Sequence, residues 1–125
     1  MAAVPVSDLA AMLAGMAPVL DERAWFFVQV EGAPPADAFA LIREDEGITA
    51  IVAGAGEGAV FARITLMVHS ALEGVGLTAA VSGALAGVGI ACNVVAGYHH
   101  DHLLVPWDRR EEALAVLRGL AVAPS

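Results

Sequence analysis

The stretch that decides the fold runs from Arg63 to Pro106 and reads RITLMVHSALEGVGLTAAVSGALAGVGIACNVVAGYHHDHLLVP. Hydrophobic periodicity and glycine positions divide it into a strand over 63–68, a turn over 70–76, a helix over 77–88, a strand over 91–96, and a third strand after 98–102. A glycine turn that leads into a helix collects unpaired backbone N–H groups, and an anionic group such as a carboxylate can be held there. The stretch therefore predicts where a small ligand binds, and it says less about which ligand.

The first of these strands has one face suited to burial. Because side chains alternate across a strand, one face receives Ala62, Ile64, Leu66 and Val68. The opposite face is mixed and receives Arg63, Thr65, Met67 and His69. The following helix carries an apolar stripe with a period of about 3.6 residues. We therefore expect helices to cover one face of a sheet.

The rest of the chain predicts a helix at each end and three strands between them. Ser7 can cap the first helix. The expected elements that follow are strands over 25–30, 39–43 and 48–52, a hairpin turn over 44–47, and a glycine-rich loop over 53–58. Asp108 and Glu111 have the spacing of a capping box at the start of the last helix.

The order of elements from Arg63 onward is strand, helix, strand, strand, helix. This is most of a ferredoxin-like βαββαβ unit, in which both helices lie on one face of an antiparallel sheet. The last strand is missing after Leu120, and the first half has one helix and three strands. We predict an α+β fold of two tandem ferredoxin-like modules with an abbreviated or interleaved first copy. The loop over 53–58 places the modules at residues 1–58 and 59–125.

The composition excludes several classes of function. A formal charge of −8, from 14 acidic side chains against 6 basic ones, argues against nucleic-acid binding, which needs clustered cations. The chain is 58% hydrophobic with a mean hydropathy of +0.72, yet no apolar run approaches the roughly 20 residues of a membrane-spanning helix. Residues 1–20 make a poor signal peptide. We expect a cytoplasmic protein with no membrane partner, whose excess apolar surface forms a dense core and a subunit interface.

The histidine run gives a weak metal signal. In an extended segment His100 and His102 share a face, whereas His99 and Asp101 point the opposite way, so at most two ligands converge. Zinc typically takes three or four protein ligands, and Cys92 is the only cysteine. A structural hairpin entry, in which Asp101 holds a neighbouring imidazole, or a ligand contact explains the run better than a metal does. We expect no metal and no other cofactor.

A catalytic role has no better support. His69 and Ser70 are adjacent in sequence, and the chain lacks the strand-to-helix elbow that presents a nucleophilic serine. We therefore predict no catalytic residue and no enzymatic activity.

Two polar residues leave alternatives open. Glu73 lies beside the glycine turn, where it repels a bound carboxylate unless it points away, or pairs with an ammonium or guanidinium group. Asn93 lies in an otherwise apolar strand, where an unpaired amide costs about 1–3 kcal/mol. Its partner is either neighbouring backbone or a ligand. The glycines of the turn also have a purely structural explanation, which is tight geometry.

The segments 63–78, 89–95 and 98–106 together resemble small bacterial ACT domain proteins of largely unknown function. The match spans about 25–120 and is specific within 63–106. The same subtype is similar to the sensing modules of aspartate kinases and of the animal cytosolic arginine sensor. ACT domains are regulatory ferredoxin-like modules that bind amino acids, usually at interfaces between paired modules. Here the glycine-rich 53–58 segment stands where longer relatives have a helix.

In that group the backbone of the turn after the first strand, and of the second strand, contacts the carboxylate and amino group of the ligand. The resemblance carries these contacts onto 70–78 and 93–94. Together with the polar residues considered above, the predicted ligand-binding residues are His69, Ser70, Leu72, Glu73, Gly74, Val75, Gly76, Leu77, Thr78, Asn93, Val94, Asp101 and His102.

These observations predict a non-enzymatic regulatory protein that binds a small molecule, an amino acid, and forms a homo-oligomer, most simply a dimer. The alternative is a ligand-free structural or interaction module that serves homodimerisation or docks onto an enzyme. Neither the amino acid nor a downstream target can be read from the sequence.

Overall fold

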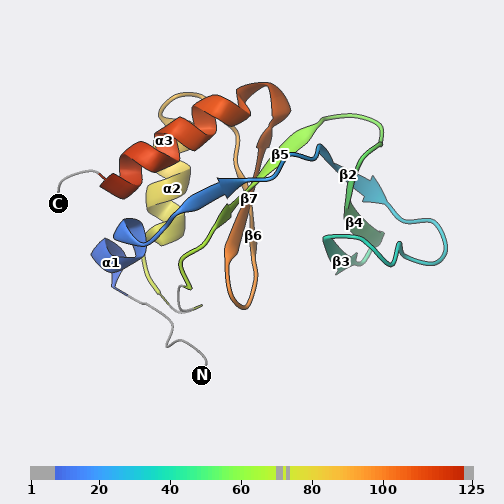
Figure 1. Ribbon diagram of the computed structural model, residues 1–125. Helices are drawn as coiled ribbons and strands as arrows, with labels where there is room; N and C mark the ends of the chain where they lie inside the picture. The colour runs from blue at the N-terminus through green and yellow to red at the C-terminus, as the bar shows by residue number, and fades with distance from the viewer. Residues whose placement is uncertain (1–7, 70–71, 73, 123–125) are drawn as a thin grey trace.

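The computed structural model describes residues 8–69, 72 and 74–122. Its elements, in chain order, are α1 (Leu9–Ala14), β1 (Pro18–Leu20), β2 (Trp25–Gln29), β3 (Ala40–Glu44), β4 (Gly47–Ala53), β5 (Phe61–Leu66), α2 (Leu77–Ala86), β6 (Asn93–Ala96), β7 (Asp101–Pro106), the 3₁₀ turn η1 (Trp107–Arg109) and α3 (Arg110–Val122) (Figure 1). The strands and helices expected within these residues are present. One further strand, β1, was not predicted.

The strands of the described chain form one antiparallel sheet in the order β3-β4-β2-β5-β7-β6, with β1 on the same edge of β5 as β2. Strand β1 pairs with β5 from Pro18 opposite Leu66 to Leu20 opposite Ile64. It thereby supplies the fourth strand of the C-terminal ferredoxin-like unit, whose order is β1-β5-β7-β6. The strand that the sequence lacks after Leu120 comes from before the unit, so the two copies are interleaved.

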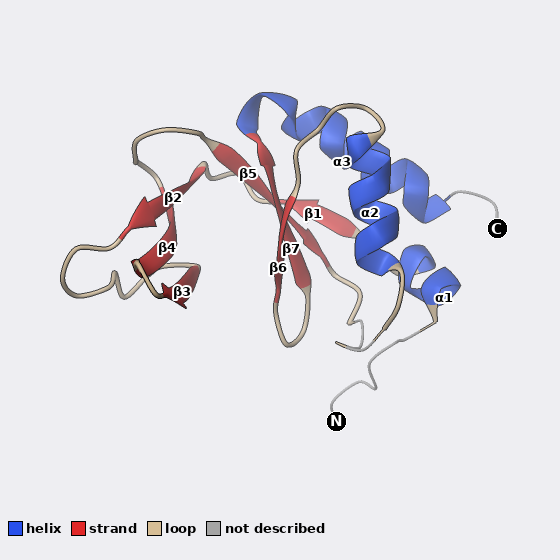
Figure 2. Ribbon diagram, turned by 180° about the vertical axis from the view of Figure 1, so that it is seen from behind, coloured by secondary structure: helices blue, strands red, loops and turns tan. Residues whose placement is uncertain are grey.

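Helices α1, α2 and α3 cover one face of this four-stranded part of the sheet (Figure 2). The fully buried residues of the layer come from both helices and strands, and include Met12, Met16, Ile64, Leu66, Val81, Leu85, Leu103, Val105 and Leu117. The predicted apolar face of β5 is therefore confirmed as the helix-covered face. Its opposite face carries Arg63 and Thr65.

Strands β2, β3 and β4 form a three-stranded antiparallel unit in which β4 lies between β2 and β3, and this β2–β3–β4 unit lies to one side of the helical layer (Figure 1). A single register pair, Trp25 opposite Phe61, joins the β2–β3–β4 unit to β5. A second apolar cluster holds this unit against the helix-free face of the C-terminal sheet, and it consists of Trp25, Ile51 and Leu104 with Phe27, Phe39, Ala40, Phe61 and Val95 packed around them.

Arg63 lies at the centre of this junction. Its guanidinium is 4.5 Å from the Trp25 ring centre and 4.3 Å from that of Phe39, and its Nη2 donates to Asp21 Oδ2 at 2.9 Å. The Asp21 N–H also donates to the Arg63 carbonyl at 2.9 Å. Both side chains of the ion pair are nearly buried, at 16% and 15% exposure. The segment after β1 is thus fastened to β5 by main chain and side chain.

Two predicted helix caps differ from the structure. Asp8 caps α1 by accepting from the Ala11 N–H at 3.0 Å, and Ser7 lies outside the described residues. The predicted capping box of Asp108 and Glu111 is wrong, because the chain leaves β7 through η1 and α3 begins at Arg110.

Arg109, within η1, caps a different helix. It donates to the carbonyls of Val88 at 2.9 Å and Gly89 at 3.1 Å, just beyond the end of α2. A cation at this position also opposes the negative end of the helix dipole.

The predicted loop over 53–58 is present from Gly54 onward, because Ala53 still belongs to β4, and its glycines have steric reasons. Gly54 and Gly58 have φ angles of 101° and 87°, where side chains are strained. A Cβ on Gly56 would lie 2.7 Å from the Phe26 ring. No helix among the described residues is both long enough and apolar enough to cross a membrane.

Asp21→Asn tests the junction. Hydrogen bonds from Arg23, then Arg63, hold the pKa of Asp21 well below its usual range, although burial opposes them. A carboxyl group whose pKa is lowered by folding contributes to stability above its unfolded pKa of about 3.9. This contribution is lost as pH falls through the pKa of the folded state. We expect Asp21→Asn to lose about 1–3 kcal/mol of unfolding free energy at pH 7, measured by urea denaturation.

The difference in unfolding free energy between Asp21→Asn and wild type should narrow below about pH 4, because there the unfolded wild-type chain takes up a proton at Asp21. Glu22→Gln, at the exposed neighbouring acid, is the matched control and should leave stability almost unchanged. Equal effects of the two substitutions at pH 7 would show that the Asp21 ion pairs do not hold the junction.

Candidate functional site

A small cavity lies where the first turn of α2 faces the tip of the β6–β7 hairpin. Its volume is about 90 Å³, and its lining residues are Leu72, Gly74, Leu77, Thr78, Ala96, Gly97 and Asp101. It is far smaller than the roughly 300–1,000 Å³ pockets of drug-sized ligands. The cavity can hold a ligand of only a few heavy atoms, or part of a larger one that extends into solvent.

The start of α2 supplies hydrogen-bond donors beside this cavity. Gly76 precedes the helix with a φ of 104°, and as a glycine it supplies no side-chain cap to the helix. Among the described residues, no backbone carbonyl accepts from the N–H groups of Thr78 or Ala79. These groups lie at the positive end of the helix dipole, so they favour an anion.

Glycine is required on both sides of the cavity. The positive φ of Gly76 suits glycine, and a Cβ there would lie 3.2 Å from the Leu9 side chain of α1. At the hairpin tip the Gly97 N–H donates to the His100 carbonyl at 2.9 Å, and a Cβ on Gly97 would lie 2.9 Å from that same oxygen. This tight turn directs the chain so that Asp101 begins β7 opposite α2.

Asp101 brings a carboxylate to the cavity. It lies on the helix-covered side of β7, as Leu103 does two residues later. Burial raises the pKa of the Asp101 carboxyl, an effect that His100 opposes. Among the described residues it has no salt-bridge partner. A partly desolvated carboxylate without a countercharge favours a cationic group such as an ammonium.

The cavity brings together the predicted residues Leu72, Gly74, Leu77, Thr78 and Asp101. The predicted residues His69, Val75 and Gly76 flank it along the chain and do not line it. The predicted residues Ser70 and Glu73 lie outside the described residues.

Sequence reasoning missed Ala96 and Gly97, which line the cavity. The available signal was the pair Ala96-Gly97 before Tyr98, since a glycine at a hairpin tip allows close approach.

Asn93 and Val94 lie at the other end of β6. Asn93 pairs with Leu104, whereas Ala96 pairs with Asp101 next to the cavity. Three residues of strand separate them by about 10 Å. Asn93 is exposed on an edge strand, so water can satisfy its amide, and Val94 packs against the helix-side core.

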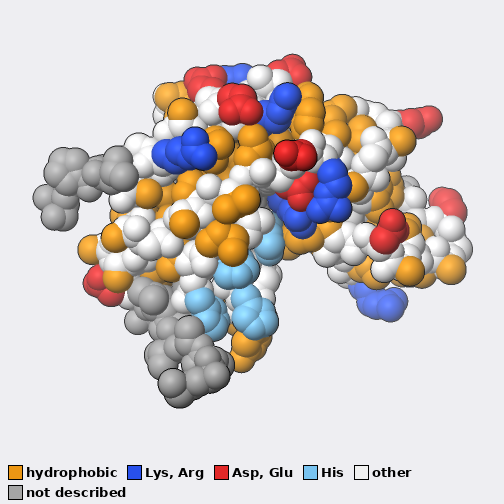
Figure 3. Space-filling view, in the orientation of Figure 1, with side chains coloured by type: hydrophobic (Ala, Val, Ile, Leu, Met, Phe, Trp, Pro, Cys, Tyr) orange, Lys and Arg blue, Asp and Glu red, His pale blue; other side chains and the backbone are white. Residues whose placement is uncertain are grey.

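His102 faces away from the cavity, because it follows Asp101 in an extended strand. Its Nδ1 is 3.0 Å from the Thr65 hydroxyl, and its ring contacts Phe39 edge-on at 4.8 Å between ring centres. Histidine side chains gather on one side of the molecule (Figure 3), with 5.6 Å between the ring centres of His69 and His99. Within the part of the chain that is described, no three His, Cys, Asp or Glu side chains form a group that could hold a metal ion.

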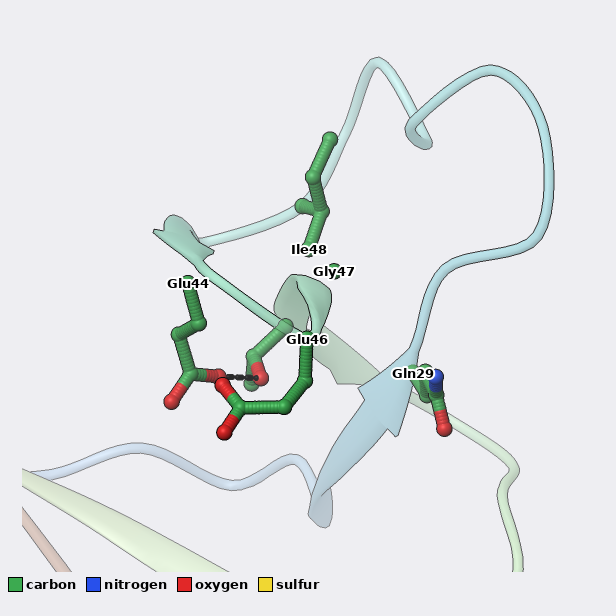
Figure 4. A pocket seen from close by; sticks show the side chains of 6 residues that line it. Gln29, Glu44, Glu46, Gly47 and Ile48 are labelled. Carbon is green, nitrogen blue, oxygen red and sulfur yellow. Dashed lines mark hydrogen bonds between the residues drawn. The ribbon is translucent and has the colours of Figure 1, made fainter.

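Two larger hollows formed by described residues lie elsewhere. One, of about 310 Å³, lies at the β3–β4 hairpin, and its lining includes the exposed acids Glu44 and Glu46 (Figure 4). Glu44 accepts a hydrogen bond from the Thr49 hydroxyl. The acids of this hollow are solvated and have no donor array opposite them, so the smaller cavity has the better chemistry for a zwitterion.

The other hollow, of about 410 Å³, lies beside β1, and its lining includes Asp21, Trp107 and Arg110. Asp21 is engaged by two arginines. Arg110 stacks on Trp107, with 3.7 Å from its guanidinium carbon to the ring centre. Asp21 and Arg110 are therefore already paired or stacked within the protein, whereas the other charged residues of the lining, Glu22 and Glu111, are exposed acids.

Comparison with known proteins agrees with this architecture. Two family models, each described as an ACT domain, match residues 5–57 and 62–119. No curated protein matches the chain significantly.

Two solved structures are similar. A Vibrio cholerae protein of unknown function, described as a possible transport protein, is 39% identical over 90% of this chain and 95% of its own, with a TM-score of 0.79. A protein from Agrobacterium tumefaciens is 20% identical over 79% and 82%, with a TM-score of 0.59, and shares the fold.

The fold and these matches define a protein of paired ferredoxin-like modules. The chain belongs to the ACT domain proteins. ACT domains are typically ligand-binding regulatory modules, which agrees with a donor-bearing cavity at the start of α2.

Asp101→Asn tests whether the cavity holds a carboxylate at a cost to stability. An acid whose folded pKa is raised loses stability as pH rises through its ordinary value toward the raised one. We therefore expect Asp101→Asn to have a higher melting temperature than wild type at pH 7, and the gain to disappear near pH 3. The control, Asp45→Asn in the exposed hairpin turn, should show no such gain. A lower melting temperature for Asp101→Asn at pH 7 would mean that the carboxylate is stabilised by the fold.

Proposed function

We propose that this protein is a cytoplasmic, non-enzymatic regulator that binds an amino acid in the cavity between α2 and the β6–β7 hairpin. The observation that carries the proposal is the placement of the Asp101 carboxylate, which has no salt-bridge partner among the described residues, in the same cavity as the first turn of α2. Such an arrangement complements both charges of a zwitterion.

Each half of the ligand has a counterpart. Its carboxylate accepts from the N–H groups at the first turn of α2, where the helix dipole adds about 0.3–1 kcal/mol. Its ammonium group donates to Asp101, and a charge-assisted hydrogen bond of this kind contributes about 1.5–3 kcal/mol. Leu72 and Leu77 supply apolar walls.

Binding changes the protein through the elements that it joins. The ligand bridges the first turn of α2 and the start of β7, so it favours conformations in which helix and hairpin are close. A ligand that prefers one arrangement shifts the population toward it, and a partner that reads that arrangement then responds.

A thermal-shift screen over the twenty amino acids at millimolar concentration tests the proposal. A ligand at about 100 times its dissociation constant stabilises the native state by about 2.7 kcal/mol, so at least one amino acid should raise the melting temperature. Asp101→Asn should weaken the binding of that amino acid by about tenfold or more in calorimetry. Glu46→Gln, at the distant hairpin, is the control and should bind as wild type does.

The absence of any stabilising amino acid would favour the second candidate function, a ligand-free interaction module. The observation behind that candidate is a set of exposed apolar side chains near the cavity, Leu72 at 68%, Val75 at 82% and Tyr98 at 75%. Exposed apolar side chains that form one contiguous patch are typical of an interaction surface. In that case sedimentation should show a homodimer that Val75→Asp dissociates with no ligand present.

A further inference from the structure

Phe39 joins the β2–β3–β4 unit to the C-terminal sheet. It precedes β3, and its N–H donates to the Ile51 carbonyl of β4 at 2.9 Å, so it moves with the β2–β3–β4 unit. Its ring contacts the Arg63 guanidinium at 4.3 Å and the His102 ring at 4.8 Å, both on the helix-free face of the C-terminal sheet. One aromatic ring therefore lies against two basic side chains from neighbouring strands.

The surroundings of His102 suit a neutral imidazole. The Thr65 hydroxyl of β5 lies within hydrogen-bond distance of its Nδ1, at 3.0 Å. The apolar Val95 of β6 pairs with His102, and Phe39 of the β2–β3–β4 unit contacts its ring. The titratable or charged groups that act on it are Arg63 of β5 and His100 of the preceding turn, which both disfavour a second positive charge.

No carboxylate is available to compensate a protonated His102 among the described residues. Asp101 is on the other face of β7, where it lines the cavity. Asp21, the acid that bonds Arg63, is already paired with Arg23 at 2.7 Å and Arg63 at 2.9 Å. A half-buried imidazolium without a counterion is unfavourable.

Few backbone contacts join the two halves of the protein at His102. Backbone pairing between the β2–β3–β4 unit and β5 is limited to Trp25 opposite Phe61, so the second apolar cluster provides most of the remaining attachment. We propose that His102 is an acid-sensitive latch between the two halves of the protein: its neutral ring holds Phe39 and the β2–β3–β4 unit in place, and its protonation releases them.

The pH at which the latch acts follows from linkage. Burial, and then the charges of Arg63 and His100, lower the pKa of His102 in the folded protein. A lowered folded pKa means that the neutral form is favoured by folding. The latch is therefore closed above the ordinary histidine value of about 6.5, and it weakens as pH falls below that value toward the lowered one.

Hydrogen exchange with mass spectrometry at pH 7.5 and 5.5, corrected for intrinsic exchange rates, tests the latch. In wild type, acidification should lower protection several-fold in β2, β3 and β4, and much less in β5 and β7. Glutamine in His102→Gln stays neutral and keeps an acceptor for Thr65. In this variant β2, β3 and β4 should therefore retain most of their protection from hydrogen exchange at pH 5.5. His99→Gln, at an exposed histidine, is the matched control and should behave as wild type does.

A second measurement works on the wild-type side chain and guards against misfolding of His102→Gln. In a Trp107→Phe background, Trp25 is the single remaining tryptophan, and it lies in the same apolar cluster as Phe39. Its fluorescence should change with a midpoint equal to the NMR titration midpoint of His102. Equal acid loss of protection in His102→Gln, loss spread evenly over the sheet, or two unrelated midpoints would each overturn the proposal.

Discussion

The pairing of β1 with β5 is the constraint on which the rest of the structure depends. Without it the C-terminal sheet would end at β5 and expose a row of unpaired backbone groups. The same short strand carries the chain from α1 into Asp21, whose backbone and side chain both bond to Arg63. Strand β1 therefore completes the C-terminal module, and the strands that follow it, β2 to β4, belong to the N-terminal module. A fold built this way cannot be cut between the modules without losing a strand.

How much of this fold the sequence predicts depends on whether the signal is local. The β5 alternation and the helix that begins at Leu77 are written in neighbouring residues, and both were predicted correctly. Pro18–Leu20 has no periodicity of its own, and its strand conformation is set by the free edge of β5, more than 40 residues away. Asp108 failed as a cap for a related reason, because a tertiary contact of Arg109 with the end of α2 decides how the chain leaves β7.

The candidate site shows the same division. Glycines before α2 indicated where donors would gather, and strand alternation placed Asp101 and His102 on opposite faces of β7. Both were nevertheless predicted as ligand contacts, and of the two Asp101 lines the cavity. The strand residues facing them depended on the length of the β6–β7 hairpin, which fixes Ala96 opposite Asp101 and leaves Asn93 three residues away. An apolar neighbourhood in sequence also suggested that Asn93 is buried, but β6 is an edge strand and the side chain reaches water.

Adjacent residues of β7 connect the two features proposed here. Asp101 turns toward the helices and the cavity, while His102 turns toward Phe39 and the β2–β3–β4 unit. Both residues pair with β5 and β6, so a shift of the β7 backbone moves both of them. A ligand that shifts this backbone when it binds Asp101 would therefore also move His102 at the junction. By reciprocity, a change at the junction would then alter the affinity of the cavity. Regulation by ligand and by pH would then share one strand, and their coupling would require no contact between the two sites.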